Sequence, residues 1–271
     1  MALTVNTNMA SMRAANSLNN TQGSLSHTLS RISSGLRVTK AADDAAGMAV
    51  ATNLSTQARS GRQAIRNAND GVSVIQTAES ASKEVLNILD RMRELAVQSS
   101  SETLATDERD YVNDEFDDLS NEVQRIAKAT EFNDIALSDG TKTALTVQVG
   151  VNNGTANQVS ISLGDLTVST LGIGTSSVDL TTASGAQTAI NTIDSAIESV
   201  NDIRADYGST QNRLESSISN MTSYVESLSG AASQIMDADY AHETSEMTRL
   251  QVMQQAGVAA LAQAKGMNSS V

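Results

Sequence analysis

Few residues of this chain have types and spacings that could perform chemistry. His27 and His242 are the only histidines, and cysteine is absent. Neither histidine lies in a local nucleophile or metal-ligand pattern, so we interpret both as ordinary surface or interface residues. The absence of cysteine excludes disulfide bonds, cysteine-ligated zinc and thiol catalysis.

Two pairs of carboxylates, Asp43–Asp44 and Asp237/Asp239, could hold a hard cation. A calcium loop, however, needs ligands at alternate positions, a central glycine and a distant glutamate, and this pattern is missing. We therefore expect acids that begin helices or face solvent. Gly172 and Gly174 form only a fragment of a phosphate-binding loop. The sequence predicts no enzyme, no metal site and no cofactor.

The net charge of −13 argues against a nucleic-acid partner, because phosphate binding relies on lysine and arginine. No apolar run approaches the ~20 residues that cross a bilayer, so we expect no membrane insertion. The start, MALTVNTNMASMRAANSLNN, lacks the basic and apolar blocks of a cleaved signal peptide. These features alone favour a cytoplasmic protein.

The elements that would position these residues are mostly helices. Aromatic residues are only 2% of the chain and proline is absent, which suits thin helix-on-helix layers. A spacing of three and four predicts a helix over 15–36, interrupted by Ser33-Ser34-Gly35. The same spacing predicts a helix at the other end. Its stripe consists of Leu250, Met253, Gly257, Ala260, Leu261, Ala264 and Met267.

Between these ends, apolar periodicity predicts a helix from Asp43 or Asp44 to about Ser100, and another that Thr106 or Asp107 caps. The alternation over 145–151 and 159–163 predicts a β-hairpin with its loop at 152–157. We interpret 169–185 as a loop and expect a long helix to resume near Ala186. The fold class is therefore mainly α: an elongated rod of long coiled-coil-like helices from both chain ends, which pair, with a small β-hairpin region in the middle.

Long motifs at both ends of the chain make it resemble bacterial flagellin. The N-terminal part carries ISSGLRVTKAADDAAGMAVATNL, RNANDGVSVIQTAE, DRMRELAVQSS and ATEFNDIAL. The C-terminal part carries RADYGSTQNRLESSISNM, DADYAHETSEMTR and LQVMQQAGVAALAQA. In this family a terminal pair called D0 lines the inner tube and a helical D1 with a β-hairpin surrounds it. The resemblance implies D0 at 1–42 and 231–271, and D1 at 43–176 and 177–230, without the outer D2 and D3 domains.

The resemblance also implies a function: a structural subunit that polymerises into the flagellar filament for motility, with terminal helices that fold on assembly. It replaces the cytoplasmic location with an extracellular one, reached by flagellar type III export without a cleaved signal peptide. The implied partners are other copies of the chain, an export chaperone, the export apparatus, the filament cap and hook-junction proteins. Members of the family usually end in an apolar tip a few residues beyond the position of Val271.

Two sets of site residues follow. The subunit-packing residues are Leu18, Leu25, Leu29, Ile32, Leu36, Leu250, Met253, Gly257, Leu261 and Met267. By the resemblance, Arg91, Leu95 and Glu115 match residues recognised by the vertebrate flagellin-sensing Toll-like receptor. Arg91 and Leu95 share a helix face, and their alternative role is contact with the next subunit.

Three other functions remain open at this stage. A hook–filament junction protein shares the terminal similarity, although RNANDGVSVIQTAE and the QQAGVAALAQA tail are closer to the filament protein. A cytoplasmic helical signalling rod would be a dimer with both ends ordered. An exported enzyme would need a catalytic constellation that the sequence lacks.

Overall fold

The computed structural model describes residues 8–175 and 177–269. The chain divides into two compact units. A terminal unit comprises Met1–Ala58 and Glu226–Val271, and a central unit comprises Arg59–Val225. Two long helices, α2 (Ala45–Ser99) and α5 (Ala183–Met236), contribute residues to both units.

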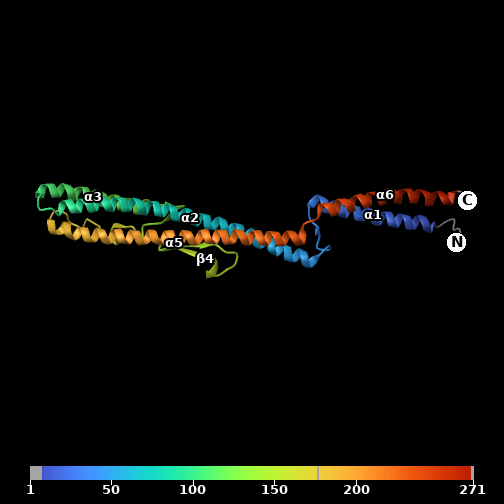
Figure 1. Cartoon of the computed structure of the whole chain (residues 1–271), viewed down its shortest axis with the longest axis horizontal. Helices are drawn as coiled ribbons and strands as arrows, with labels where there is room; N and C mark the ends of the chain where they lie inside the picture. The colour runs from blue at the N-terminus through green and yellow to red at the C-terminus, as the bar shows by residue number, and fades with distance from the viewer. Residues whose placement is uncertain (1–7, 176, 270–271) are drawn as a thin grey trace. The chain divides into compact units, whose positions relative to one another are not determined.

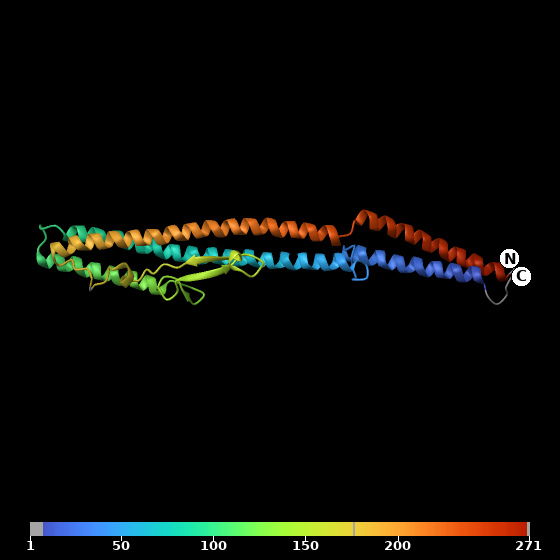
Figure 2. The same ribbon diagram turned by 90° about the horizontal axis from the view of Figure 1, so that it is seen from below.

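The terminal unit is built on a pair of helices from opposite ends of the chain, α1 (Met9–Ser34) and α6 (Tyr240–Ser269). They lie side by side in both ribbon views, as predicted (Figures 1 and 2). Asn8 caps α1 by accepting from the Ser11 N–H at 3.0 Å, and its Nδ2 donates to the Ala264 carbonyl at 2.9 Å. The start of α1 therefore meets the end of α6, so the two helices are antiparallel.

The predicted interruption after Ser34 is confirmed. Gly35 has a positive φ of 71°, a conformation that glycine adopts without a Cβ penalty, and its N–H bonds to the Arg31 carbonyl at 2.8 Å. The segment that follows α1 and the segment that precedes α6 are joined to each other. Leu36 and Asp237 form an isolated antiparallel bridge, and the Ala238 N–H donates to the Gly35 carbonyl at 2.9 Å.

The central unit contains most of α2 and α5 together with α3 (Thr106–Ala129). With 55 residues, α2 is about 80 Å long. Its bounds agree with the expected start near Asp44 and end near Ser100. The predicted cap of α3 is wrong: Thr106 is the first helical residue, and the cap position belongs to Ala105. The N–H of Ala105 donates to Glu108 Oε2 at 3.2 Å, which is the bond that the glutamate of a capping box makes to the cap residue.

The predicted hairpin is confirmed, although its first strand ends at Gln148 rather than at 151. Strands β3 (Ala144–Gln148) and β4 (Gln158–Ser162) pair antiparallel, with Leu145 opposite Ile161 and Val147 opposite Val159. A short 3-10 turn, η1 (Thr155–Asn157), lies in the loop. The hairpin packs closely on α2 at Gly71, where a Cβ would lie 3.1 Å from Val147 Cγ2. Glycine at this position lets the strand approach the helix.

Two features of the middle segment were not predicted. A second strand pair, β1 (Glu131–Phe132) with β2 (Ile135–Ala136), turns through Asn133 and Asp134, whose φ angles are 50° and 62°. Asparagine and aspartate tolerate this left-handed conformation in two-residue hairpin turns. The expectation that 169–185 is entirely loop is wrong at both ends: α4 (Val168–Leu171) forms one helical turn at its start, and α5 begins at Ala183.

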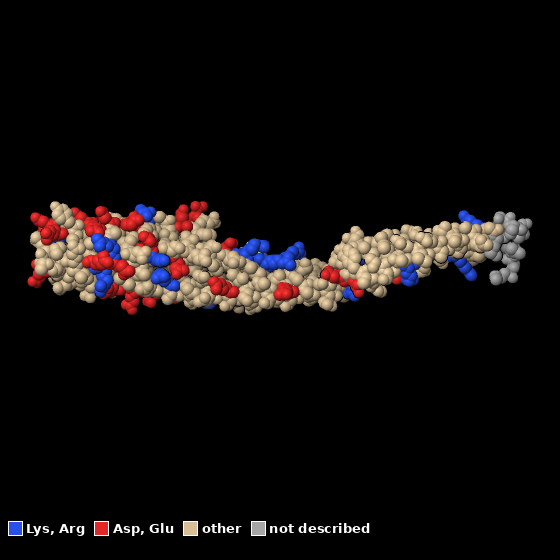
Figure 3. Space-filling view, turned by 45° about the horizontal axis from the view of Figure 1, so that its top comes forward, with Lys and Arg blue, Asp and Glu red and all other residues tan. Residues whose placement is uncertain are grey.

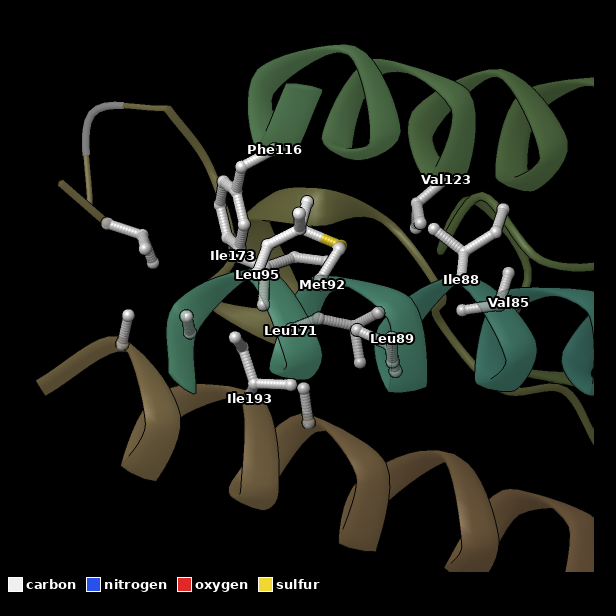
Figure 4. Close-up of a cluster of buried hydrophobic side chains, with 14 of the residues drawn as sticks. Val85, Ile88, Leu89, Met92, Leu95, Phe116, Val123, Leu171, Ile173 and Ile193 are labelled. Atoms are coloured by element: carbon white, nitrogen blue, oxygen red, sulfur yellow. The ribbon is translucent and has the colours of Figure 1, made fainter. Parts of the chain in front are cut away.

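Two buried clusters hold the central unit together. One joins α2, α3 and α5, with residues of 166–180 filling the gap between them (Figure 4). The other joins α2 and α5 to the β3–β4 hairpin around Ile75, Ile161 and Tyr207. The predicted fold class is confirmed: long helices come from both chain ends, with small antiparallel strand pairs between them.

Candidate assembly surfaces

The inner face of the α1–α6 pair follows a heptad spacing. On α1 the least exposed side recurs at Leu18, Thr21, Leu25, Thr28 and Ile32, and only Leu25 (6%) and Thr28 (5%) are nearly inaccessible. On α6 the least exposed side includes Leu250, which is 4% exposed, and continues at Gly257 and Leu261. A Cβ at Gly257 would lie 3.2 Å from Leu18 Cδ1, so the two helices are in close contact there.

Two of the predicted subunit-packing residues do not lie on this inner face. Leu29 is 46% exposed and Met253 is 44% exposed. The adjacent residues Thr28 and Gln254 turn toward the partner helix instead. The role of Leu29 and Met253 in subunit packing therefore stays a prediction that concerns the outer faces. Leu36 lies beyond α1 in the bridge to Asp237. The side chain of Met267 lies outside the described residues.

The outer faces of the pair carry large apolar side chains exposed by about half. On α1 these are Met9, Met12 and Leu29, and on α6 they are Val252, Met253 and Val258. Charges are sparse over the same length: Arg13 and Lys265 are the charged residues in 8–26 and 250–269. An exposed surface that is apolar and nearly uncharged is typical of a surface that other chains cover.

An ion pair and a hydrogen bond fasten the end of the pair where α1 ends and α6 begins. Glu243, which the sequence analysis did not single out, is 5% exposed, and Arg31 Nη1 lies 3.3 Å from its Oε1. His27 Nε2 lies 3.0 Å from Asp43 Oδ1. The Thr39 N–H, opposed by burial and aided by the Lys40 N–H, lowers the pKa of Asp43 well below its usual range. The sequence signal for Glu243 was its place one heptad before Leu250.

The remaining candidate chemistry is accounted for locally. Asp44 and Asp239 sit at helix starts, where their Oδ1 atoms accept from the N–H groups of Gly47 at 2.8 Å and Ala241 at 2.9 Å, as expected. His242 is exposed on α6. Within the described residues no group of histidines and carboxylates could hold a metal ion. In the same part of the chain no helix is both long and apolar enough to cross a membrane.

Arg91 and Glu115 lie together on the surface of the central unit. Arg91 on α2 donates from Nη2 and Nε to Glu115 Oε1 on α3, at 2.8 and 3.2 Å, and from Nη1 to Glu94 at 2.9 Å. Leu95 does not share this exposed face. It is 1% exposed and points into the buried cluster beside Phe116 and Ile173 (Figure 4).

The fold and these surfaces define a class: a helical structural protein whose two chain ends form one unit and whose outer surface suits self-association. Comparison with known families is specific. The model described as the bacterial flagellin N-terminal helical region matches residues 5–143. The model for the bacterial flagellin C-terminal helical region matches residues 190–271.

Similar proteins support this assignment over the whole length. A flagellin of Halalkalibacterium halodurans is 41% identical over 260 residues, which cover 96% of this chain and 95% of that protein. The flagellar filament 33 kDa core protein of Treponema phagedenis is 36% identical and covers 98% of each. This chain belongs to the bacterial flagellin family. It is therefore a structural component of the flagellar filament rather than an enzyme.

Solved structures agree. The Bacillus cereus flagellin crystal structure has a TM-score of 0.50 at 30% identity, covering 58% of this chain and 88% of that one. A putative flagellar hook-associated protein from Vibrio parahaemolyticus has a TM-score of 0.60 at 14% identity, covering 72% and 100%. The second likeness concerns the fold alone.

Proposed function

We propose that this flagellin is an exported, extracellular subunit whose α1–α6 pair completes its folding when neighbouring copies cover it. The observation that carries the proposal is the contrast between the two faces of that pair. Its inner face buries Leu25 and Leu250, whereas its outer faces expose six large apolar side chains.

The energetic balance supports folding on assembly. Ordering one residue costs about 1–2 kcal/mol of backbone conformational entropy. Burying one large apolar side chain contributes about 1.5–3 kcal/mol. The two helices have 26 and 30 residues but bury few side chains between them, so the pair gains little folding free energy by itself. Covering Met9, Met12, Leu29 and the α6 valines with other copies supplies further burial, as in other cases of coupled folding and association.

Family membership supports our proposal of the remaining partners. We propose that the chain leaves the cell through the flagellar type III export apparatus, with an export chaperone and without a cleaved signal peptide. At the growing filament it would meet the cap, and at the base the hook-junction proteins. We also propose that residues 1–42 and 231–271 form the D0 part and that residues 43–230 form the D1 part. These parts are defined by their place in the filament, whereas the two compact units are defined by contacts within one chain.

Truncation tests the role of the terminal pair. Deleting residues 250–271 removes the α6 half of the seam, so we expect no filaments on seeding with short filament fragments, by electron microscopy. The thermal unfolding temperature of the central unit should stay unchanged, because its buried clusters lie within 59–225. Filaments that still form from the truncated chain would contradict the terminal-packing proposal.

A sharper version changes only the outer face. Replacing Leu29 and Met253 by glutamine should raise the critical concentration for growth about tenfold or more, since each loses apolar burial against a neighbour. The matched control, Leu29→Met with Met253→Leu, keeps the surface apolar and should grow normally. Assembly that stops at a species of fixed size, already fully helical, would instead favour a hook–filament junction protein.

We further propose that the surface around Arg91 and Glu115 is recognised by the vertebrate flagellin-sensing Toll-like receptor. Its support is the adjacency of the two exposed side chains on α2 and α3, at positions that match the family motif. Leu95 would act from the core, by fixing the two helices against each other, rather than by direct contact. Because neighbouring subunits cover this surface in the family, the recognised form would be the monomer.

A receptor reporter assay with monomer tests this second proposal. Arg91→Ala should reduce signalling at least several-fold, because it removes the cation and frees Glu115. Arg93→Ala is the matched control: it removes a similarly exposed arginine that pairs with Asp194 on α5 instead. Equal signalling from both variants and the parent chain would refute the assignment.

A further inference from the structure

A short basic stripe crosses α2 within the central unit. Arg59, Arg62 and Arg66 are exposed and follow a spacing of three and four, which places them on one helix face. Arg66 donates from Nε to Gln63 Oε1 at 3.2 Å. Within the described residues neither Arg62 nor Arg66 forms an ion pair. The space-filling view shows basic side chains gathered in one patch, on a protein whose net charge is −13 (Figure 3).

A matching acidic stripe lies on α3. Asp107, Asp110, Asp114 and Asp118 are exposed and follow a spacing of three, four and four, again on one helix face. In the part of the chain that the structure describes, none of these four has a cationic partner. Figure 3 shows acidic side chains gathered over the end of the central unit that α3 occupies. Four unpaired carboxylates on one face repel one another unless a cationic surface covers them.

The two stripes cannot meet within one molecule. Arg91 pairs with Glu115, so the acidic stripe lies beside that level of α2. Arg62 lies about 45 Å away along the same helix, at 1.5 Å per residue. Within the described residues Arg62 and Arg66 thus have no carboxylate partner, and the chain itself carries an acidic stripe of the same spacing.

We propose that the basic stripe of one copy binds the acidic stripe of α3 in the next copy, in a head-to-tail contact between central units. Such a contact uses two different patches, so it can repeat from copy to copy, as an open helical filament requires. Several neighbouring charge pairs set register and association rate more than total affinity. The inference rests on the proposed polymerisation and specifies which surfaces direct it.

The test is a charge-swap series in seeded assembly. The variant Arg62→Asp/Arg66→Asp and the variant Asp110→Arg/Asp114→Arg should each elongate parent seeds about tenfold more slowly or worse, because like charges then meet. The chain carrying all four changes keeps the net charge. It should extend seeds made of itself, yet fail to extend parent seeds.

Two controls make the series decisive. Arg213→Glu/Lys142→Glu makes a comparable charge change at exposed positions outside both stripes and should elongate normally. Circular dichroism should show every variant folded, since all the changed side chains are exposed. Normal growth of either single-stripe variant, equal loss in the control pair, or a four-fold swap that does not extend its own seeds would overturn the inference. Failure of the parent chain to assemble would instead overturn the proposed function.

Discussion

At the scale of single residues, polar side chains fasten the terminal pair where α1 ends and α6 begins. Asp43 shows how this is done. Its Oδ2 accepts from the N–H groups of Thr39 and Lys40, each at 3.0 Å, while Oδ1 faces His27. One carboxylate thus holds the turn before α2 and ties it to α1.

The depressed pKa of Asp43 makes this turn sensitive to acid. A carboxyl whose folded pKa lies below its unfolded value of about 3.9 stabilises the folded form fully above that value. The stabilisation is lost as pH falls through the folded pKa. We expect hydrogen exchange at the Thr39 and Lys40 amides to accelerate below about pH 4, relative to intrinsic rates.

Asp43→Asn checks this prediction. In this variant the Thr39 and Lys40 amides should already exchange faster at neutral pH, and the further acceleration in acid should be absent. Asp70→Asn, at an exposed position on α2, serves as the control and should keep it. Parallel pH profiles for Asp43→Asn and the parent chain would show that the carboxylate does not hold the turn.

At the scale of elements, a buried hydroxyl fastens the start of the segment between the hairpin and α5. Tyr207 on α5 is 1% exposed, and its Oη accepts from the Gly164 N–H at 3.1 Å. Burial raises the pKa of this phenol, so it stays protonated. The bond ties the end of the β3–β4 hairpin to the long helix.

Tyr207→Phe should lower the free energy of unfolding of the central unit by about 1–2 kcal/mol, because the Gly164 N–H loses its partner in a partly buried place. Denaturant unfolding followed by circular dichroism measures the change. Tyr111→Phe, at a tyrosine that is 74% exposed, should change stability by less than about 0.5 kcal/mol. If both variants lost the same free energy of unfolding, the hydrogen bond from Gly164 to Tyr207 would not contribute to stability.

At the scale of the whole molecule, the two units differ in how much of their apolar surface the chain itself buries. The central unit encloses two clusters, whereas the terminal pair exposes apolar residues on its outer faces. Regions with few buried contacts open most readily. The terminal pair is therefore the part whose stability depends on other copies.

Trypsin should reveal this difference. In the monomer we expect rapid cleavage after Arg13 and Lys265, near the ends of α1 and α6, and slow cleavage within the central helices. In seeded filaments the two terminal sites should be protected, and circular dichroism should show a gain in helix. Peptides from the central unit provide the internal reference. Terminal sites equally resistant in monomer and filament would argue against folding on assembly.

The sequence by itself determined most features that depend on neighbours along the chain. Spacings of three and four located the long helices, alternation located the β3–β4 hairpin, and Ser33-Ser34-Gly35 marked the end of α1. The family motifs at both ends identified the flagellin. These features are local because backbone conformation and side-chain direction repeat with fixed periods.

Only the tertiary structure decided which neighbouring stripe of a helix faces a partner. Positions 28 and 29 are about 100° apart around α1, and periodicity favoured the more apolar Leu29. The position of α6 selected Thr28 instead. Similarly, Leu95 shares a helix face with Arg91 in sequence terms, yet α3 and the 166–180 segment cover it. A side chain's burial depends on what packs across from it, and that is a property of the folded chain.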